Sequence, residues 1–287
     1  MKIEFFTPSY GVPTESFGAA TFGFVGAENE CLSSAVSLAQ DLEGDMVCGS
    51  YDECLQRIDA LGAGHWQVGI VLFGNGGGEN EFLRALAERV KIPFVGGGAA
   101  ICPQTGRRAL ISGEGQVAVF LVRDERYDFE VLRENIHHEI LGEHRITFTD
   151  QRKIDRIDGQ DPVSWLNTEK AKLGLSVDDF EHLTLSDLSG NNAHLSLQEG
   201  EIRSGRDLEP RMLLRYVPKE EVLSRMQSFY DDENAIVFGC AGLRGILPEK
   251  LRTKGIGLFL FGEVCTHEGK SEFANLMLSK LRITKRL

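Results

Sequence analysis

The sequence predicts an α/β fold built from two similar halves, and three observations support this prediction. Near-continuous apolar runs, such as residues 67–73, are typical of buried strands. Segments with apolar residues three and four positions apart, such as residues 79–90, are typical of amphipathic helices. A shift of 165 positions aligns two glycine-rich units without a gap. We therefore expect an internal duplication, in which each half is a mixed sheet with covering helices.

The chain has 287 residues, which is enough for one large or two medium domains. We place the first half at residues 1–160 and the second at residues 161–287. The aligned pairs are Phe73 with Phe238, Gly74 with Gly239, Gly77 with Gly242, Phe94 with Phe259 and Gly97 with Gly262. Chance convergence of two strand–loop–strand units is the alternative explanation.

Composition narrows the function classes. Hydrophobic residues make up 42% and charged residues 26% of the chain, which is typical of a globular protein. The net charge of -12 repels phosphate backbones and argues against nucleic acid as a partner. No run approaches the roughly 18 apolar residues of a membrane span, so we expect no membrane insertion. The six cysteines form no CxxC pair, and the N-terminus lacks a secretory pattern, which predicts a cytoplasmic location.

The order of elements can be read from the same patterns. In the first part of the chain we expect strands at 20–26, 67–73, 94–100 and 116–122, helices at 27–42, 51–61 and 79–90, and a glycine loop at 74–78. In the second part we expect a hairpin from 146–149 and 153–157 and a turn at Asp158-Gly159. A helix from Asp161-Pro162 to Gly174 should follow. The last third should contain strands at 235–239 and 256–261, a glycine loop at 240–245 and a closing element at 273–283.

Glycines at predicted strand ends are the first candidate binding groups. Gly96, Gly97 and Gly98 lack side chains, so their backbone N–H groups are able to approach a carboxylate or carbonyl closely. A tight turn packed against a neighbouring strand is the alternative. The loop at 74–78 has neither the Gly-Lys-Ser/Thr of a phosphate loop nor the spacing of a dinucleotide fingerprint.

Two charged residues stand beside glycines at the predicted strand ends. If the two units pack side by side, Arg244 and Glu263 point into one crevice. A guanidinium there would hold a carboxylate and a carboxylate would hold an ammonium, which together suit a zwitterion such as an amino acid. An ion pair between the two side chains is the alternative.

Cysteine and histidine residues are the remaining candidates for catalytic or metal-binding groups. Cys240 follows an apolar strand, where a nucleophile is often exposed, with His267 and Glu263 as base and orienting group. The alternative is that Cys240 is a small hydrophobic residue buried in the core. Adjacent side chains such as His137 and His138 rarely share an ion, so we predict surface or helix-face histidines and no metal site.

Several motifs of the C-terminal third resemble those of the FIST family. They are Phe238-Gly-Cys240-Ala-Gly242-Leu-Arg244, then Gly257-Leu-Phe-Leu-Phe-Gly262-Glu263, and then Asn275. The element Ile146-Thr-Phe-Thr followed by Ile154-Asp-Arg-Ile-Asp-Gly159-Gln-Asp-Pro162 is similar to the family's threonine strand and turn. The chain departs from the family in its additional Leu243, and only Asn275 remains of a longer polar stretch.

The resemblance implies a sensory domain that binds amino acids or similar small carboxylates. With it, Cys240, Gly242, Gly262 and Asn275 join Gly96, Gly97, Gly98, Arg244 and Glu263 as the nine candidate ligand-binding residues. No cofactor is predicted; haem, which the resemblance links to some relatives, is not excluded, although no haem-ligating histidine is matched. The signal would pass to a separate output protein. An enzyme with Cys240 as its nucleophile and a regulatory interaction subunit without ligand are the alternative functions.

Overall fold

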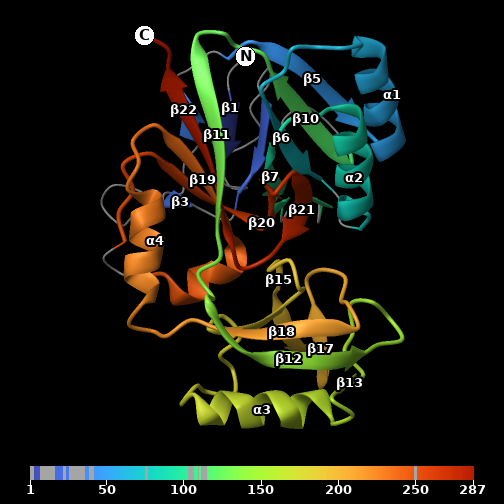
Figure 1. Ribbon diagram of the computed structural model, residues 1–287, viewed down its shortest axis with the longest axis vertical. Helices are drawn as coiled ribbons and strands as arrows, with labels where there is room; N and C mark the ends of the chain where they lie inside the picture. The colour runs from blue at the N-terminus through green and yellow to red at the C-terminus, as the bar shows by residue number, and fades with distance from the viewer. Residues whose placement is uncertain are drawn as a thin grey trace.

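The computed structural model describes residues 3–6, 17–21, 24–25, 36–38, 42–74, 77–102, 107–108, 110, 115–248 and 251–287. These residues form an α/β structure with mixed sheets and few helices, as the sequence predicts. A large sheet occupies the upper part of the molecule in Figure 1, and a smaller sheet with one helix lies below it.

The large sheet has ten strands within the described residues. Across the sheet they are β11 (Tyr127–Glu134), β22 (Leu278–Lys285), β19 (Ala235–Cys240), β20 (Ile256–His267), β7 (Phe94–Gly98), β6 (Val68–Phe73), β10 (Val117–Val122) and β5 (Gly44–Gly49), with β21 (Lys270–Ala274) and β3 (Phe24–Val25) also paired to β20. The neighbours β19–β20 and β6–β7 are parallel, and the other pairs are antiparallel. Every residue of β6 and β10 is buried, which explains their continuous apolar sequences.

Helices cover one face of the large sheet. In the described part of the chain they are α1 (Tyr51–Leu61), α2 (Glu79–Arg89) and α4 (Val222–Tyr230). The first two lie side by side at one end of the sheet and α4 lies at the other (Figure 1). Ser50 caps α1 in a capping box with Glu53, and the helix ends at Leu61 as predicted, with Gly62 as its C-cap. The opposite face carries a continuous apolar core that includes Ile70, Phe120 and Leu260.

Several short strands belong neither to the large sheet nor to the smaller sheet with its helix; we call these two parts the large unit and the small unit. Three of them form a sheet of β2 (Phe17–Ala20), β1 (Ile3–Phe6) and β4 (Val36–Leu38), and two more pair as β8 (Ile101–Cys102) and β9 (Arg107–Arg108). The helix predicted at 27–42 is wrong for residues 36–38, which pair with β1 as a strand; residues 27–35 and 39–41 lie outside the described residues. Val36 and Leu38 also satisfy the alternation of a strand, and β1 supplies the partner.

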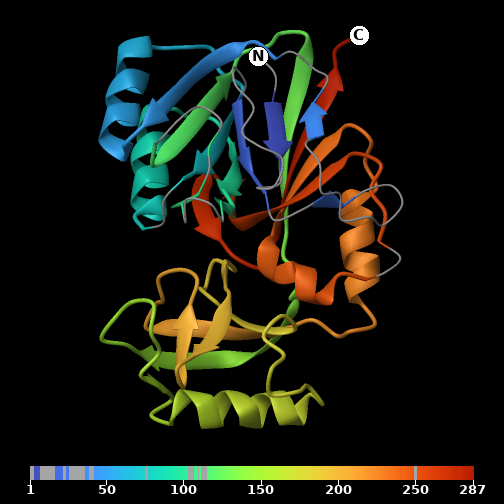
Figure 2. The same cartoon turned by 180° about the vertical axis from the view of Figure 1, so that it is seen from behind.

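The small unit is made by residues 139–216. Its sheet has the order β13 (Arg156–Ile157), β12 (Glu139–Thr147), β18 (Arg211–Tyr216), β14 (Leu183–Ser186) and β15 (Asn192–Ala193), beside the hairpin of β16 (Leu195–Gln198) and β17 (Glu201–Ser204). The predicted hairpin is confirmed in part: Ile146 pairs with Ile157 and Thr147 with Arg156, but residues 148–149 and 153–155 belong to neither strand. Helix α3 (Pro162–Lys172), capped by Asp161 as expected, covers the far side of this unit through Trp165 and Leu166 (Figure 2).

The chain crosses between the two units twice, once after β11 and once after β18. The predicted boundary at 160/161 therefore falls inside the small unit, between β13 and α3. At the first crossing, His137 is fully buried, and its Nε2 lies 2.6 Å from the Glu181 carbonyl oxygen. Burial lowers the pKa of His137 to about 4, so the prediction of a surface histidine is wrong for this residue.

Two further elements differ from the expectations. The predicted loop at 240–245 contains a 3₁₀ helix, η1 (Ala241–Ile246). Strand β20 does not end at Gly262 but continues to His267. Gly262 has φ +72, and the pairing register with β7 shifts between Phe261 and Glu263, so a bulge lets the strand continue. No helix in the described part of the chain is both long and apolar enough to span a membrane.

Candidate functional site

The structure brings the two predicted glycine-rich strands together at the centre of the large sheet. Gly97 of β7 pairs with Glu263 of β20, and Gly98 pairs with Phe261. A Cβ atom on Gly96 would lie 2.0 Å from the Val71 carbonyl oxygen, and one on Gly97 would lie 2.3 Å from that of Gly262. The amides of a central strand point at its two neighbours, so these glycines allow close strand packing.

Glu263 lies inside the protein and not in an open crevice. The residue is only 1% exposed, and its Oε1 accepts a hydrogen bond of 2.8 Å from the Met277 N–H. Oε2 is buried and has no hydrogen-bond partner among the described residues. Burial raises the pKa of Glu263 well above its ordinary value, although the Met277 N–H and the Arg133 charge act in the opposite direction. Burial therefore favours the uncharged form of this carboxyl group.

The charge of Glu263 acts on two other buried groups, Tyr230 and Cys240. We call these three residues, with Asn275 next to the strand partner of Glu263, the central polar cluster. Tyr230 Oη and Asn275 Oδ1 are also buried without a hydrogen-bond partner in the described structure. Burial, with Glu263 adding to it, raises the pKa of Tyr230. Asn275 follows Ala274, the strand partner of Glu263, and its N–H donates to the Asn192 carbonyl oxygen at 3.0 Å. This cluster thus reaches the contact between the two units.

Replacement of Glu263 by glutamine is expected to change how stability depends on pH. A raised pKa in the folded state means that the wild-type stabilisation is complete below pH 4.5 and is lost as pH rises towards the folded pKa. The Glu263→Gln variant should therefore become more stable relative to the wild type as pH increases above 4.5. Urea unfolding from pH 4 to 9 measures this difference. Glu268→Gln, on the exposed turn of the same hairpin, is the control; parallel profiles for wild type and Glu263→Gln would contradict a raised pKa.

Cys240 does not have the surroundings of an activated nucleophile. Burial, with the Glu263 carboxyl adding to it, raises the pKa of Cys240 to about 12, so the group is a thiol at neutral pH. Cys240 pairs with Leu260 on β20, whereas His267 lies seven residues further along that strand. At about 3.3 Å per residue the separation is roughly 23 Å. The predicted pairing of Cys240 with His267 as its base is therefore wrong.

Arg244 and Gly242 lie on η1, at the contact with the small unit. Leu243, the additional residue in the loop, is fully buried, and Arg244 is exposed. A Cβ on Gly242 would lie 3.1 Å from the ring of His194 in the small unit. Inward packing of Leu243 turns the next side chain outward, so Arg244 and Glu263 do not share one crevice.

The cleft between the two units is the strongest candidate for a binding site. It has a volume of about 740 Å³ and lies between α2, the β20–β21 hairpin and residues 206–209. Its lining includes the cations Arg84, Lys91, Arg206 and Lys270 and the anions Glu88, Glu209 and Glu272. None of the nine residues predicted from the sequence lines this cleft. Arg206 and Glu209 belong to no motif, so only the fold could identify them.

Arg206 forms the buried part of the cleft wall. Its side chain is 7% exposed, and Nη1 donates hydrogen bonds of 2.8 Å to Asp187 Oδ2 and to the Asn191 carbonyl oxygen. Nε is buried and has no hydrogen-bond partner among the described residues. Burial acts to raise the pKa of Asp187, but the Arg206 charge and the hydrogen bonds from Asn191 and Arg206 outweigh it and lower the pKa. The guanidinium is thereby held in one orientation at neutral pH.

Polar contacts beside the cleft join its two walls. Asn191 Nδ2 of the small unit donates to Glu272 Oε2 on β21. Arg152 Nη2 lies 3.5 Å from Oε2 of Glu79, a buried residue at the start of α2. These contacts make the wall positions sensitive to the relative placement of the two units.

Comparison with known proteins adds no assignment to this geometry. No protein-family model matches the chain, and no curated protein is significantly similar to it. The resemblance to the FIST family stays a prediction that rests on the motifs quoted above, and the functional argument rests on the cleft between the two units.

Proposed function

We propose that this protein is a sensor that reversibly binds an amino acid or a similar small carboxylate in the cleft between its two units. The observation that carries the proposal is the buried Arg206 in the wall of a cleft of about 740 Å³. This volume is within the range of roughly 300–1,000 Å³ that is typical of small-molecule sites. Junctions between structural units are common places for such sites.

The charges of the cleft support a zwitterionic ligand. Arg206 is oriented by Asp187 and Asn191, and a fixed guanidinium is well suited to attract a carboxylate and to donate a charge-assisted hydrogen bond to it. Glu209 and Glu272 lie in the same lining and supply negative charge for an ammonium group. A cleft lined by charges of one sign only would instead favour a purely anionic or a purely cationic ligand.

The placement of these groups on both units supports a sensory role. Arg206 and Glu209 belong to the small unit, whereas Lys270 and Glu272 belong to the large sheet. A ligand that contacts both walls stabilises the arrangement in which the walls are close, and this population shift is the signal. In line with the FIST resemblance, we propose a cytoplasmic location and a separate output protein that reads this arrangement.

We also infer an internal duplication within the large sheet. The strand sets β5-β10-β6-β7 and β11-β22-β19-β20 both run antiparallel, antiparallel and then parallel from the edge to the centre. Helices α1 and α4 each precede the third strand of their set, and both lie on the same face. In this proposal the small unit is an insertion between the first strand and the helix of the second set.

Filling the cleft is expected to abolish ligand binding without disturbing the fold. Ala87 is a half-buried residue of α2 in the lining, so Ala87→Trp places an indole in the cleft and leaves every charged group present. We expect amino acids or short carboxylates at one hundred times their Kd to stabilise the wild type by about 2.7 kcal/mol and Ala87→Trp by none. A thermal-shift panel measures this effect.

The matched control is Ala85→Trp, which adds the same side chain to a half-buried position of α2 outside the lining. It should respond to ligand as the wild type does. A ligand that stabilises Ala87→Trp fully but not Arg244→Ala would move the site to the residues predicted from the sequence. A panel with no stabilising amino acid or carboxylate would contradict the proposed function.

A further inference from the structure

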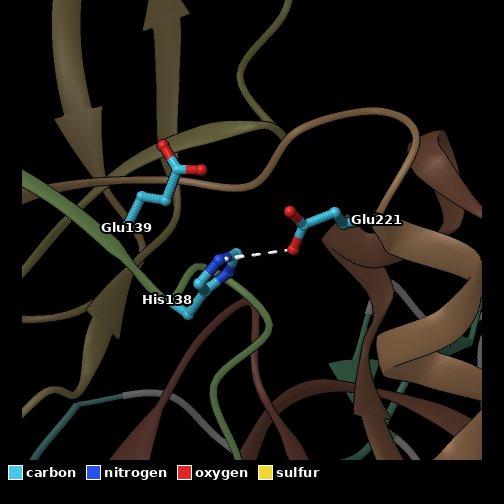
Figure 3. A group of neighbouring side chains, drawn as sticks. All are labelled: His138, Glu139 and Glu221. Carbon is cyan, nitrogen blue, oxygen red and sulfur yellow. Dashed lines mark ion pairs between the residues drawn. The ribbon is translucent and has the colours of Figure 1, made fainter.

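A histidine and two glutamates lie together where the chain crosses between the two units. His138 belongs to the first crossing, after β11, Glu139 is the first residue of β12, and Glu221 belongs to the second crossing, just before α4. One nitrogen or oxygen atom from each residue lies within 4.8 Å of those from the other two. Figure 3 shows His138 between the two glutamates, with its ring directed at the Glu221 carboxylate. His138 and Glu221 are far apart in the sequence, so no local motif reveals this group.

The hydrogen bond of the His138 ring determines which nitrogen is available. Nδ1 lies 3.3 Å from the Ile136 carbonyl oxygen. A carbonyl oxygen only accepts, so Nδ1 must carry the hydrogen in this contact. In the neutral ring Nε2 then presents a lone pair, and it lies 3.3 Å from Glu221 Oε2. Fixing one ring nitrogen by a backbone carbonyl is the usual way in which proteins orient a metal-binding histidine.

The charges around this group favour a cation. With the hydrogen on Nδ1 of a neutral ring, Nε2 and the two carboxylates are all acceptors, a set of atoms that attracts a positive ion or a proton. Arg225 lies on one side, with Nε 3.2 Å from Glu221 Oε2, and its Nη1 also lies 3.7 Å from Glu134 Oε1. Arg225 therefore faces two carboxyl groups, those of Glu221 and Glu134.

We propose that His138, Glu139 and Glu221 bind one divalent transition-metal ion of the zinc class. An imidazole nitrogen with two carboxylate oxygens is a ligand set that zinc accepts, whereas magnesium and calcium prefer oxygen alone. Three protein ligands leave room for water to complete the coordination. Each residue is between buried and exposed, so the ion has access from solvent.

The position of the site gives the metal a structural consequence. His138 lies on the first crossing and Glu139 directly after it, whereas Glu221 lies on the second crossing, so a bound ion links the two connecting segments. These residues are distinct from the lining of the cleft between the units. Metal binding and ligand binding can therefore be tested separately, and a negative result for one proposal does not contradict the other.

The experiment is calorimetric titration of ZnCl₂ into the metal-stripped, reduced full chain. We expect one saturable Zn²⁺ per chain, and we expect His138→Ala and Glu221→Gln each to weaken binding at least about tenfold. Glu221→Gln keeps the size of the side chain, so it remains informative if His138→Ala fails to fold. Titration with Co²⁺ adds an optical readout, because its visible spectrum should change when the nitrogen ligand is lost in His138→Ala.

The control is His267→Ala, which removes an exposed histidine whose Nε2 lies 3.9 Å from Glu268 Oε1. Among the described residues, this pair has no third side chain close enough to complete a metal site. It should bind Zn²⁺ as the wild type does. Absence of saturable binding to the wild type would overturn the proposal and leave a proton as the shared cation. Unchanged affinity in both His138→Ala and Glu221→Gln would also overturn it.

Discussion

Replacement of Gly96 by alanine is expected to lower the free energy of unfolding by about 3–5 kcal/mol, from backbone strain and overpacking together. Gly96 has φ +140, a conformation that residues with a side chain rarely adopt. The new methyl group would also lie 2.0 Å from the Val71 carbonyl oxygen and 3.0 Å from its nitrogen. Since both neighbours are strand backbone, β6 and β7 would have to separate. Urea unfolding measures the loss.

The control for this prediction is Gly77→Ala. Gly77 has φ +99, but no atom of the described residues lies within 4 Å of the position that a Cβ atom would take there, so alanine meets strain without a clash among them. We expect a loss of about 1–2 kcal/mol from strain alone. Equal losses for the two variants would show that close strand packing does not explain Gly96. A stable Gly96→Ala protein that no longer binds ligand would support the sequence-based interpretation of the glycines as binding groups.

Replacement of Arg206 by methionine is expected to lower the free energy of unfolding by about 3–5 kcal/mol, because it leaves the charge of Asp187 buried without its partner. The side chains of this pair are 7% and 4% exposed. Adding Asp187→Asn should recover much of the loss, because the amide still accepts from the Asn191 N–H and carries no charge. Urea unfolding of the single and double variants measures both effects.

An exposed ion pair provides the comparison. Arg89 Nε lies 3.0 Å from Asp59 Oδ1, with side chains 34% and 54% exposed, and Arg89→Met should cost at most about 1 kcal/mol. If Arg206→Met costs no more than Arg89→Met, the buried pair does not hold the cleft wall. The double variant at Arg206 and Asp187 also tests the proposed function, because it should fold without the guanidinium and lose stabilisation by carboxylate ligands.

Local sequence patterns were sufficient for elements whose conformation is decided locally. The apolar runs of β6 and β10 and the spacing of α1 and α2 predicted these elements. The turn at Asp158-Gly159 was also predicted, and both residues have positive φ. Helix α3 begins where Asp161 and Pro162 predict it to begin. Capping, turn chemistry and periodicity act over a few residues, so they can be read without knowledge of the tertiary fold.

The candidate sites were less accessible to sequence reasoning. The glycine motifs correctly identified two strands that meet, since Gly97 pairs with Glu263. Their chemistry was not predictable, because burial and not residue type raises the pKa of Glu263 and of Cys240. His137 and His138 are adjacent in sequence, yet one is fully buried and the other faces Glu221. Residue identity gives the ordinary pKa, and the surroundings decide the shift.

The sequence by itself determined an α/β protein, the identity of its central strands and the ends of several helices. Only the tertiary structure decided that β12 and β18 pair, that β20 continues through a bulge at Gly262, and that Arg206 meets the hairpin of β20 and β21 across a cleft. These features depend on contacts between residues far apart in the chain. Such contacts form when apolar surfaces pack together, and no pattern within a short stretch of sequence specifies the partner.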